Sequence, residues 1–286
     1  AQRQLYAGTQ LFLQTACPRF GIDVTFVDGT QPGAFEEAII PGRTMLVMAE
    51  TPANPRLDII DLDALGAIAN ALTVVDSTFA TPMGQTPLAH GVDLVLHSAT
   101  KGIAGHNDAT IGVVAGSEDL MSWLWGFAVL HGANASPYDA YNAQRGVRTL
   151  DVRLRQQAGT ARLLADFLEA HDGVSDVRYP GLVSHPQHDL AVRQMRSMGG
   201  LLTFDLAGGM EAGRRFVEAT SIARQATSLG GPETLLCHSV TTTHVSLTPE
   251  ELEASGIGEG TVRVSCGLEN VDDLMADFGR GLDAAG

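Results

Sequence analysis

Residues 92–105 read VDLVLHSATKGIAG, and both the predicted fold and the predicted chemistry depend on this stretch. Its first part, VDLVLH, is a short apolar run with β-branched residues, which is typical of a buried strand. Hydroxyl-bearing residues and Lys101 follow where this run ends. We therefore expect the Lys101 amine to project from the carboxyl end of a sheet strand, the edge at which open α/β sheets bind their ligands.

Lys101 is the only lysine in the chain, because the rest of its 18 basic residues are arginines. Arginine serves wherever positive charge alone is needed, so a single retained lysine indicates chemistry that needs a deprotonatable primary amine. Schiff-base formation with a carbonyl group is such chemistry. Taken by itself, the count is explained equally well by a chance remnant on a solvated surface, so the neighbouring residues have to decide.

Asp76 ends the preceding apolar run, LTVVD at 72–76, and so places a carboxylate at the same predicted sheet edge, one strand earlier. A carboxylate paired with a pyridine nitrogen keeps that nitrogen protonated and makes the ring an electron sink. The alternative is an aspartate that caps a turn at a strand end. Asp76 and Lys101 at successive strand ends favour the pairing.

Small and hydroxyl-bearing residues surround the lysine. Ser98 and Thr100 can donate hydrogen bonds to a phosphate, and Gly102 and Gly105 allow a close approach of the backbone. Serine and threonine are common in any loop, so the pattern indicates a phosphate site only in combination with Asp76 and Lys101.

Outward from this stretch, short apolar runs alternate with segments of helical period, which predicts an α/β sheet with parallel strands. A helix is expected at 61–71, where acidic residues in the first turn suit the helix dipole. The predicted strands of this half are 22–27, 44–49, 72–76, 92–97 and 110–115.

The pattern changes at about residue 147, which predicts two domains, 1–146 and 147–286. A long amphipathic helix is expected at 150–170, with Leu150, Leu154, Ala158 and Ala161 on one stripe. The rest reads as an α+β domain. Its predicted elements are a turn-rich segment at 179–188 and then a further helix, a strand at 201–206, a helix from 210, a strand at 261–266 and a terminal helix.

Composition excludes several functions. Eighteen basic and 33 acidic residues give a formal charge of -15, which repels nucleic acid and anionic membranes. The chain has no apolar run of the roughly 20 residues that span a bilayer and no signal-peptide pattern, so we expect a cytoplasmic protein. Cys17, Cys237 and Cys266 are few and widely spaced, which favours reduced buried thiols over disulfides or a zinc site.

Six segments in order resemble the signatures of one enzyme family, the cystathionine γ-synthase and γ-lyase group of pyridoxal-phosphate (PLP) enzymes. The resemblance implies fold-type I, with a mostly parallel seven-stranded sheet domain and a smaller α+β C-terminal domain. It also implies PLP as cofactor. The segments are ETPANPRLDIIDL at 50–62, VVDSTFATP at 74–82, HSATKGIAGHND at 97–108, YPGLVSHPQH at 179–188, SLGGPETL at 228–235 and TVRVSCGLEN at 261–270.

By position, the resemblance implies that Lys101 carries the cofactor and that Asp76 binds the pyridine nitrogen. Tyr6, in LYAGT, matches a tyrosine that stacks on the cofactor and assists proton transfer. The remaining implied contacts are to phosphate from Ser98 and Thr100, to the ring from Thr78, to the phenolic oxygen and the substrate from Asn54, and to the substrate carboxylate from Arg263, helped by Ser228. His97, His106 and Asp108 are an alternative metal cluster, but the resemblance implies that no metal is used.

The implied reaction is γ-elimination or γ-replacement on a sulfur-containing or O-acylated homoserine-type amino acid. An O-acylhomoserine sulfhydrylase is the alternative, to which TTTH at 241–244 has a slight resemblance. By the resemblance, Cys237 stands where an acidic residue usually contacts a distal amino group, so the acidic contact that would recognise cystathionine is missing. Gly8 replaces the cysteine of methionine γ-lyases, and Gly102 replaces a common aromatic residue.

The resemblance also implies a homodimer or homotetramer with shared active sites. The family's phosphate-binding Ser-Gly-Met loop and its inter-subunit Tyr-x-Arg both correspond to positions before residue 1, so the sequence is expected to lack an N-terminal part of the large domain. A truncated, non-catalytic homologue is therefore a further alternative.

Overall fold

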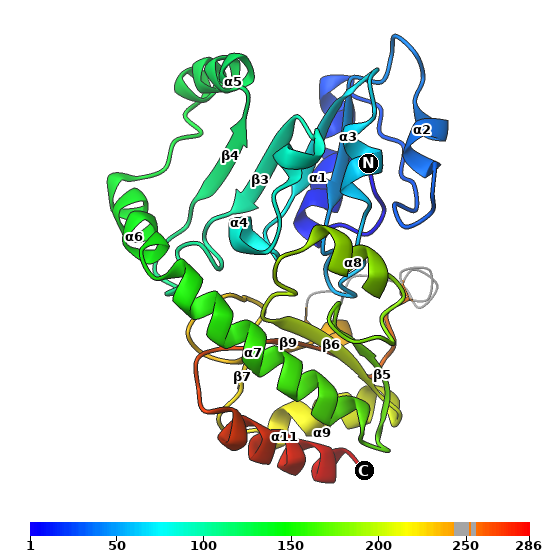
Figure 1. The fold of residues 1–286 in the computed structure, drawn as a ribbon, viewed down its shortest axis with the longest axis vertical. Helices are drawn as coiled ribbons and strands as arrows, with labels where there is room; N and C mark the ends of the chain where they lie inside the picture. The colour runs from blue at the N-terminus through cyan, green and yellow to red at the C-terminus, as the bar shows by residue number, and fades with distance from the viewer. Residues whose placement is uncertain (243–251, 253–255) are drawn as a thin grey trace. The chain divides into compact units, whose positions relative to one another are not determined.

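The computed structural model describes residues 1–242, 252 and 256–286 (Figure 1). The chain divides into two compact units, one of Ala1–Asn54 with Asp58–Arg148 and the other of Pro55–Leu57 with Thr149–Gly286. The expected domains, 1–146 and 147–286, remain a prediction. Among the described residues, no helix combines the length and the apolar character needed to cross a membrane.

The first unit is built on a four-stranded sheet of order β1-β2-β3-β4. The strands β1, β2 and β3 are parallel, and β4 is antiparallel to β3. The strands are β1 (Leu46–Glu50), β2 (Leu72–Asp76), β3 (Leu94–Ser98) and β4 (Gly112–Gly116). The helices are α1 (Ala7–Thr15), α2 (Ala34–Ala38), α3 (Leu62–Gly66), α4 (Thr81–Gly84), α5 (Glu118–His131) and α6 (Pro137–Val147), with short 3-10 turns at Cys17–Phe20 and Pro87–His90.

The strand β2 lies inside this sheet, between β1 and β3, and its residues from Thr73 to Asp76 are all buried, as expected of a parallel strand covered on both faces. Val75 of β2 packs in a core with Val47 and Ala49 of β1 and Leu62 and Leu65 of α3. The α/β class is confirmed, with four strands in this sheet among the described residues. Figure 1 shows β3 and β4 side by side, with α5 beyond the end of β4.

Three local predictions for this unit were wrong in part. Residues 22–27 form no strand, because Val27 makes a single bridge with Gln2 and the N-terminal segment takes up its hydrogen bonds. The helix expected at 61–71 ends at Gly66, where the backbone packs so closely against the His90 carbonyl that there is no room for a side chain. The strand at 110–115 was grouped with the parallel strands, but β4 is antiparallel because its short connection from β3 contains no crossover helix.

The second unit has a five-stranded sheet of order β5-β6-β9-β8-β7, in which all pairs are antiparallel except the short pairing of β7 with β8. The strands are β5 (Val174–Arg178), β6 (Leu201–Leu206), β7 (Arg224–Gln225), β8 (Leu235–His238) and β9 (Thr261–Ser265). The helices are α7 (Leu150–Glu169), α8 (His188–Gln194), α9 (Gly209–Ala219) and α11 (Val271–Ala285), with a 3-10 turn at Ser239–Thr241.

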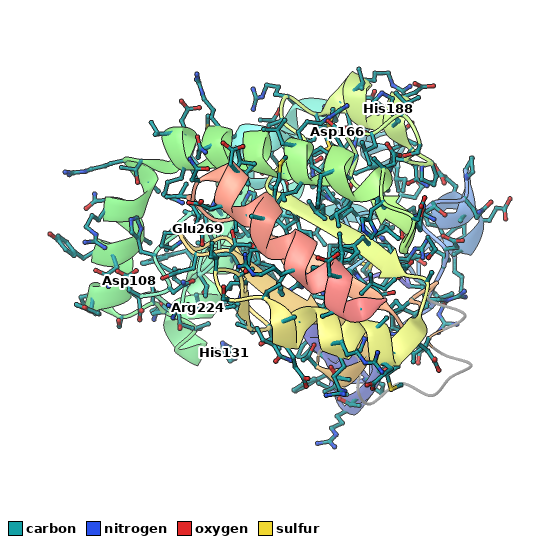
Figure 2. All side chains as sticks on the ribbon, turned by 90° about the horizontal axis from the view of Figure 1, so that it is seen from below. Asp108, His131, Asp166, His188, Arg224 and Glu269 are labelled. Carbon is teal, nitrogen blue, oxygen red and sulfur yellow. The ribbon has the colours of Figure 1, made fainter. Side chains whose placement is uncertain are left out.

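The core of this unit lies between its sheet and three helices. Figure 2 shows α11 lying between α7 and α9. Phe216 of α9 packs edge-on against Phe204 of β6 and Phe278 of α11, with ring centroids 5.1 and 5.4 Å apart. Such edge-to-face pairs add to the stabilisation from burial of the rings.

The predicted stripe on α7 was wrong in part. Leu150 and Ala161 are buried, but Leu154 and Ala158 are only half-buried. The buried face instead includes polar residues that find partners inside the unit: Arg153 donates to the Thr149 hydroxyl, and Gln157 donates to the Gly231 carbonyl. Apolar periodicity cannot detect a polar side chain that is buried with its partner.

Candidate active site

The carboxyl ends of β2 and β3 bring the predicted cofactor residues of the first unit together. Asp76 ends β2, Ser98 ends β3, and Lys101 follows Ser98 by three residues. Asp76 is paired in register with Leu96 of β3. The Lys101 N–H donates to the Ser98 carbonyl at 3.0 Å, and the Gly105 N–H donates to the Lys101 carbonyl at 2.8 Å, so two backbone hydrogen bonds define the turn that carries the lysine.

Thr78 links the two strand ends. Its backbone N–H and its hydroxyl donate to Oδ1 of Asp76 at 2.9 and 2.5 Å. The same hydroxyl accepts a hydrogen bond from the Ser98 N–H at 2.8 Å. Thr78 therefore holds the Asp76 carboxylate against the end of β3, which is a role in addition to the ring contact that the resemblance implies.

The Asp76 carboxylate has one oxygen in use and one available. Its hydrogen bonds within the described residues all go to Oδ1, and Oδ2 accepts none from them. Burial raises the pKa of Asp76, and the two hydrogen bonds from Thr78 only partly offset this effect. A protonated ring nitrogen at Oδ2 would restore a partner to the carboxylate and favour its ionised form.

The two hydroxyls beside the lysine differ. The Thr100 hydroxyl donates to the Ile111 carbonyl at 3.3 Å and accepts from the Ile111 N–H at 2.9 Å. The Ser98 hydroxyl makes no hydrogen bond with the described residues, so it is the better placed of the two to bind a phosphate oxygen. The Thr100 hydroxyl can donate to a phosphate only if its hydrogen bond to the Ile111 carbonyl is broken.

Glu50 is a site residue that sequence reasoning missed. It ends β1 and is paired in register with Asp76. Its carboxylate accepts the Tyr6 N–H at 2.7 Å and the Asn54 N–H at 2.8 Å. One buried side chain thus joins two predicted cofactor contacts that are 48 residues apart (54 minus 6). Its position as the last residue of an apolar run, like that of Asp76, was the available signal.

The predicted substrate residues lie in the second unit. Arg263 is a buried residue of β9, and its Nη2 donates to the Thr227 and Ser228 carbonyls at 2.9 and 3.1 Å. Ser228 therefore contacts Arg263 through its backbone. Cys237 of β8 is paired in register with Arg263. The position at which the resemblance implies an acidic residue thus holds a buried thiol on the strand beside the arginine.

The cysteines are buried, and two of the three candidate metal ligands have other partners. All three cysteines are free and buried, which confirms the prediction of buried thiols. His106 binds the Ala104 carbonyl through Nδ1, and Asp108 forms an ion pair with Arg145 at 3.0 Å. In the part of the chain that the structure describes, no group of three or more histidine, cysteine or acidic side chains is arranged to hold a metal.

The fold and this residue set define a class of protein: an α/β enzyme whose sheet edge holds an amine, a buried carboxylate with an available oxygen, and an available hydroxyl. This donor set fits PLP, which needs an amine for its aldehyde, a carboxylate for its ring nitrogen and donors for its phosphate. The chain belongs to the family described as Cys/Met metabolism PLP-dependent enzyme, whose model matches residues 1–283. It is therefore a PLP-dependent enzyme.

Named relatives are similar to this chain in sequence, and one of them also in its solved structure. The chain is 44% identical over 290 residues to an L-methionine gamma-lyase of Porphyromonas gingivalis, covering 99% of this chain and 72% of the relative. It is 40% identical over 285 residues to an O-succinylhomoserine sulfhydrylase of Pseudomonas aeruginosa, covering 99% and 70%. A cystathionine gamma synthase of Xanthomonas oryzae pv. oryzae, solved in complex with cystathionine, matches with a TM-score of 0.95 at 39% identity, covering 99% and 74%.

Proposed function

We propose that this enzyme catalyses γ-elimination or γ-replacement on a sulfur-containing or O-acylated homoserine-type amino acid, a reaction of transsulfuration type. The observation that carries the proposal is the placement of Asp76 and Lys101 at the carboxyl ends of adjacent parallel strands, with Oδ2 of Asp76 available. Relatives named as a γ-lyase, a sulfhydrylase and a γ-synthase support the reaction class.

The proposed roles follow from the chemistry of each residue. PLP supplies an aldehyde that bonds covalently to amines and a ring that takes up electrons. Lys101 would carry the cofactor, and its Nζ would be the base that removes the substrate Cα proton. Asp76 Oδ2 accepts a hydrogen bond from the ring nitrogen and keeps it protonated, while Ser98 and Thr100 bind phosphate.

The other roles concern orientation and proton transfer. The Tyr6 ring stacks on the cofactor, and its hydroxyl assists proton movement. Asn54 would bind the phenolic oxygen and the substrate, and Thr78 would contact the ring. Arg263, aided by Ser228, binds the substrate carboxylate with the two-pronged geometry that a guanidinium provides and an ammonium does not.

An O-acylhomoserine sulfhydrylase is the second candidate, and Cys237 favours it. A buried thiol beside Arg263 cannot hold a distal ammonium group as a carboxylate would, so substrates without that group are preferred. The TTTH segment at 241–244 resembles those enzymes, although Thr243 and His244 lie outside the described residues.

Methionine also belongs among the substrates to test, because several relatives are L-methionine gamma-lyases. Gly8, which by the resemblance replaces a cysteine of those enzymes, is expected to make this site differ from theirs. A Cβ at this position would lie 2.5 Å from Cε1 of the Tyr6 ring, so any larger residue here would displace the ring that is proposed to stack on PLP.

The first experiment is a visible absorption spectrum of the purified protein with added PLP, before and after borohydride, beside Lys101→Ala. We expect a yellow band that borohydride fixes onto a peptide containing Lys101 and that the variant lacks. A folded wild-type protein without this band would contradict the proposed site and favour a non-catalytic homologue.

Product analysis then separates the reactions. Formation of ammonia and a 2-oxo acid from methionine or cystathionine indicates γ-elimination. An O-acylhomoserine offered with sulfide yields homocysteine in a sulfhydrylase, and offered with cysteine yields cystathionine in a γ-synthase. A protein that binds PLP at Lys101 but converts none of these substrates would contradict the proposed substrate class.

We also propose a cytoplasmic homodimer or homotetramer with shared active sites. Support for assembly comes from α5 and α6, whose large apolar side chains are exposed in the single chain, including Trp123, Trp125, Leu130 and Tyr138. Exposed apolar surface of this kind is typical of association sites. Light scattering on the eluted protein measures the assembly, and a monomer that is fully active would contradict shared active sites.

A further inference from the structure

Glu50 occupies an unusual position in the first unit. It is 4% exposed, and its two carboxylate oxygens are divided between two chain segments: Oε2 accepts the Tyr6 N–H at 2.7 Å and Oε1 accepts the Asn54 N–H at 2.8 Å. Hydrogen bonds to an ionised acceptor are about twice as strong as neutral ones. A buried carboxylate is costly unless it is paired in this way, so the position calls for an explanation.

Hydrogen bonds between the N-terminal segment and β1 hold the backbone around Glu50 in place. Its own N–H donates to Oε1 of the buried Gln2 at 2.9 Å, and the Gln2 N–H donates to the Met48 carbonyl at 2.9 Å. The N-terminal segment is thereby attached along β1 up to Leu5, which is buried. Glu50 holds the next residue, Tyr6, at the carboxyl end of the same strand.

Tyr6 depends on this attachment more than a core residue would. Tyr6 is 57% exposed, so core packing does not fix its ring, which lies against Gly8. The hydrogen bond from its N–H to Glu50 therefore decides where the backbone presents the ring. Asn54 follows Glu50 by four residues, and its N–H is held by the other oxygen of the same carboxylate.

We infer that Glu50 is the positioning residue that sets Tyr6 and Asn54 relative to Asp76 at the cofactor site. The register supports this assignment, because Glu50 and Asp76 are paired at the ends of β1 and β2 and so lie side by side on the sheet. The inference rests on the proposed roles of Tyr6 and Asn54 toward PLP. Glu50 itself touches neither cofactor nor substrate in this scheme.

The test is Glu50→Gln, compared with the wild type at a temperature at which circular dichroism shows both to be folded. Glutamine keeps the volume but has one acceptor oxygen, and its NH₂ group faces the other backbone N–H. In the protein without PLP, amide hydrogen exchange at Tyr6 or Asn54 is expected to accelerate by about tenfold or more. Because Tyr6 and Asn54 are then held less precisely, PLP affinity is expected to fall roughly tenfold and kcat/KM roughly 10- to 100-fold.

A matched control exists at the opposite end of the same sheet. Asp93 Oδ2 accepts the Thr73 N–H at 2.8 Å and the Thr73 hydroxyl at 3.0 Å, where β2 begins. Asp93→Asn removes a comparable hydrogen-bonded carboxylate away from the proposed site. It is expected to reduce thermal stability while leaving exchange at Tyr6 and Asn54 and the affinity for PLP unchanged.

A double-mutant comparison separates positioning from general stabilisation. If Glu50 acts through Tyr6 and Asn54, Glu50→Gln will lower PLP affinity much less in a Tyr6→Ala, Asn54→Ala background than in the wild type. Additive effects would overturn the inference. Glu50→Asp keeps the charge and both oxygens on a shorter stem, and it is expected to show the same changes to a smaller extent if Glu50→Gln does not fold.

The outcomes distinguish this inference from the proposed function. Unchanged exchange at both amides and unchanged PLP affinity in a folded variant would overturn the role of Glu50 while the Lys101 adduct stands. A wild-type protein that forms no PLP adduct at Lys101 would overturn the proposed site and, with it, this role. The exchange measurement needs no cofactor, so it reports on the hydrogen bonds in either case.

Discussion

Asp76 in the first unit and Asp277 in the second are both buried aspartates, but their hydrogen bonding differs. Asp277 uses both oxygens: Oδ1 accepts from Ser221 and Arg280, and Oδ2 accepts the N–H groups of Ile222 and Ala223. Asp76 accepts hydrogen bonds only from Thr78, and only on Oδ1, within the described residues. The Asp277 carboxylate is saturated by its own unit, whereas the Asp76 carboxylate has an oxygen available for a ligand.

The pKa shifts differ in the same way. At Asp277, burial raises the pKa, but the backbone hydrogen bonds from Ala223, Ser221 and Ile222 outweigh burial, so the net pKa is lowered. At Asp76 burial prevails over Thr78 and the pKa is raised. A saturated carboxylate stabilises the fold, whereas an unsaturated one costs stability that a ligand can recover.

The largest expected effect on stability is from Asp277→Ala. Removing this side chain leaves the backbone N–H groups of residues 221–223 without their acceptor, so we expect a loss of roughly 3–5 kcal/mol in the free energy of unfolding. Urea denaturation measures it. The matched control is Asp273→Ala, at an exposed position in the same helix, for which less than about 1 kcal/mol is expected.

Asp76→Asn is expected to lower catalytic activity rather than stability. Without the negative charge the ring nitrogen of PLP is not held protonated, so kcat/KM should fall on the order of 10²–10³-fold. The stability of the protein without PLP should change little or increase, because burial already disfavours the charged form. Loss of stability comparable to that of Asp277→Ala, measured in the same urea titration, would show that Asp76 is structural.

The pH dependence of stability sharpens the contrast between the units. His185 in the second unit is buried, and burial, with a contribution from Arg178, lowers its pKa to about 4. The unfolded chain therefore binds a proton at higher pH than the folded chain, and stability falls as pH decreases through about 6.5. Between pH 7 and pH 5 the loss from this group is about 2 kcal/mol.

The check is to compare urea denaturation of wild type and His185→Gln at both pH values. The variant should lose the part of the pH dependence that comes from His185. Asp76 contributes with the opposite sign, because a raised carboxyl pKa disfavours the folded state as pH rises above the unfolded value. An equal pH dependence in wild type and variant would contradict the assignment to His185.

The smallest expected effect is from Thr78→Val. The variant removes the hydroxyl that joins Asp76 to the Ser98 N–H but keeps the backbone donor to Oδ1. Loss of one such hydrogen bond is expected to lower kcat/KM about tenfold. Thr78→Ser keeps the hydroxyl and serves as the control, so equal losses in both variants would indicate that the methyl group, not the hydrogen bond, is important.

Local sequence patterns predicted the structure correctly where it depends on a single strand. The runs LTVVD and VDLVLH predicted two strands, of which β2 is buried from Thr73 onward and β3 only at alternate positions. The residues at their ends predicted the sheet edge at which Asp76, Ser98 and Lys101 lie. The six segments in order predicted the family, which the match over residues 1–283 confirms. The specific roles of the site residues remain predictions.

Patterns were insufficient where distant segments meet. The strand expected at 22–27 was wrong because the N-terminal segment pairs with Val27, and the antiparallel direction of β4 depends on how its connection returns to the sheet. The buried face of α7 contains Gln157 because the distant Gly231 carbonyl accepts its hydrogen bond, whereas Arg153 donates to Thr149 at the start of the same helix.

The sequence by itself determined the class of fold, the single amine at Lys101 and the carboxylate at Asp76, because strand periodicity and residue chemistry are local properties of the chain. Only the tertiary structure decided that Thr78 occupies one oxygen of Asp76, that Ile111 engages the Thr100 hydroxyl, and that Glu50 holds both Tyr6 and Asn54. The physical reason is that a hydrogen bond between residues far apart in sequence requires the folded backbone to bring donor and acceptor together, and no local pattern encodes that distance.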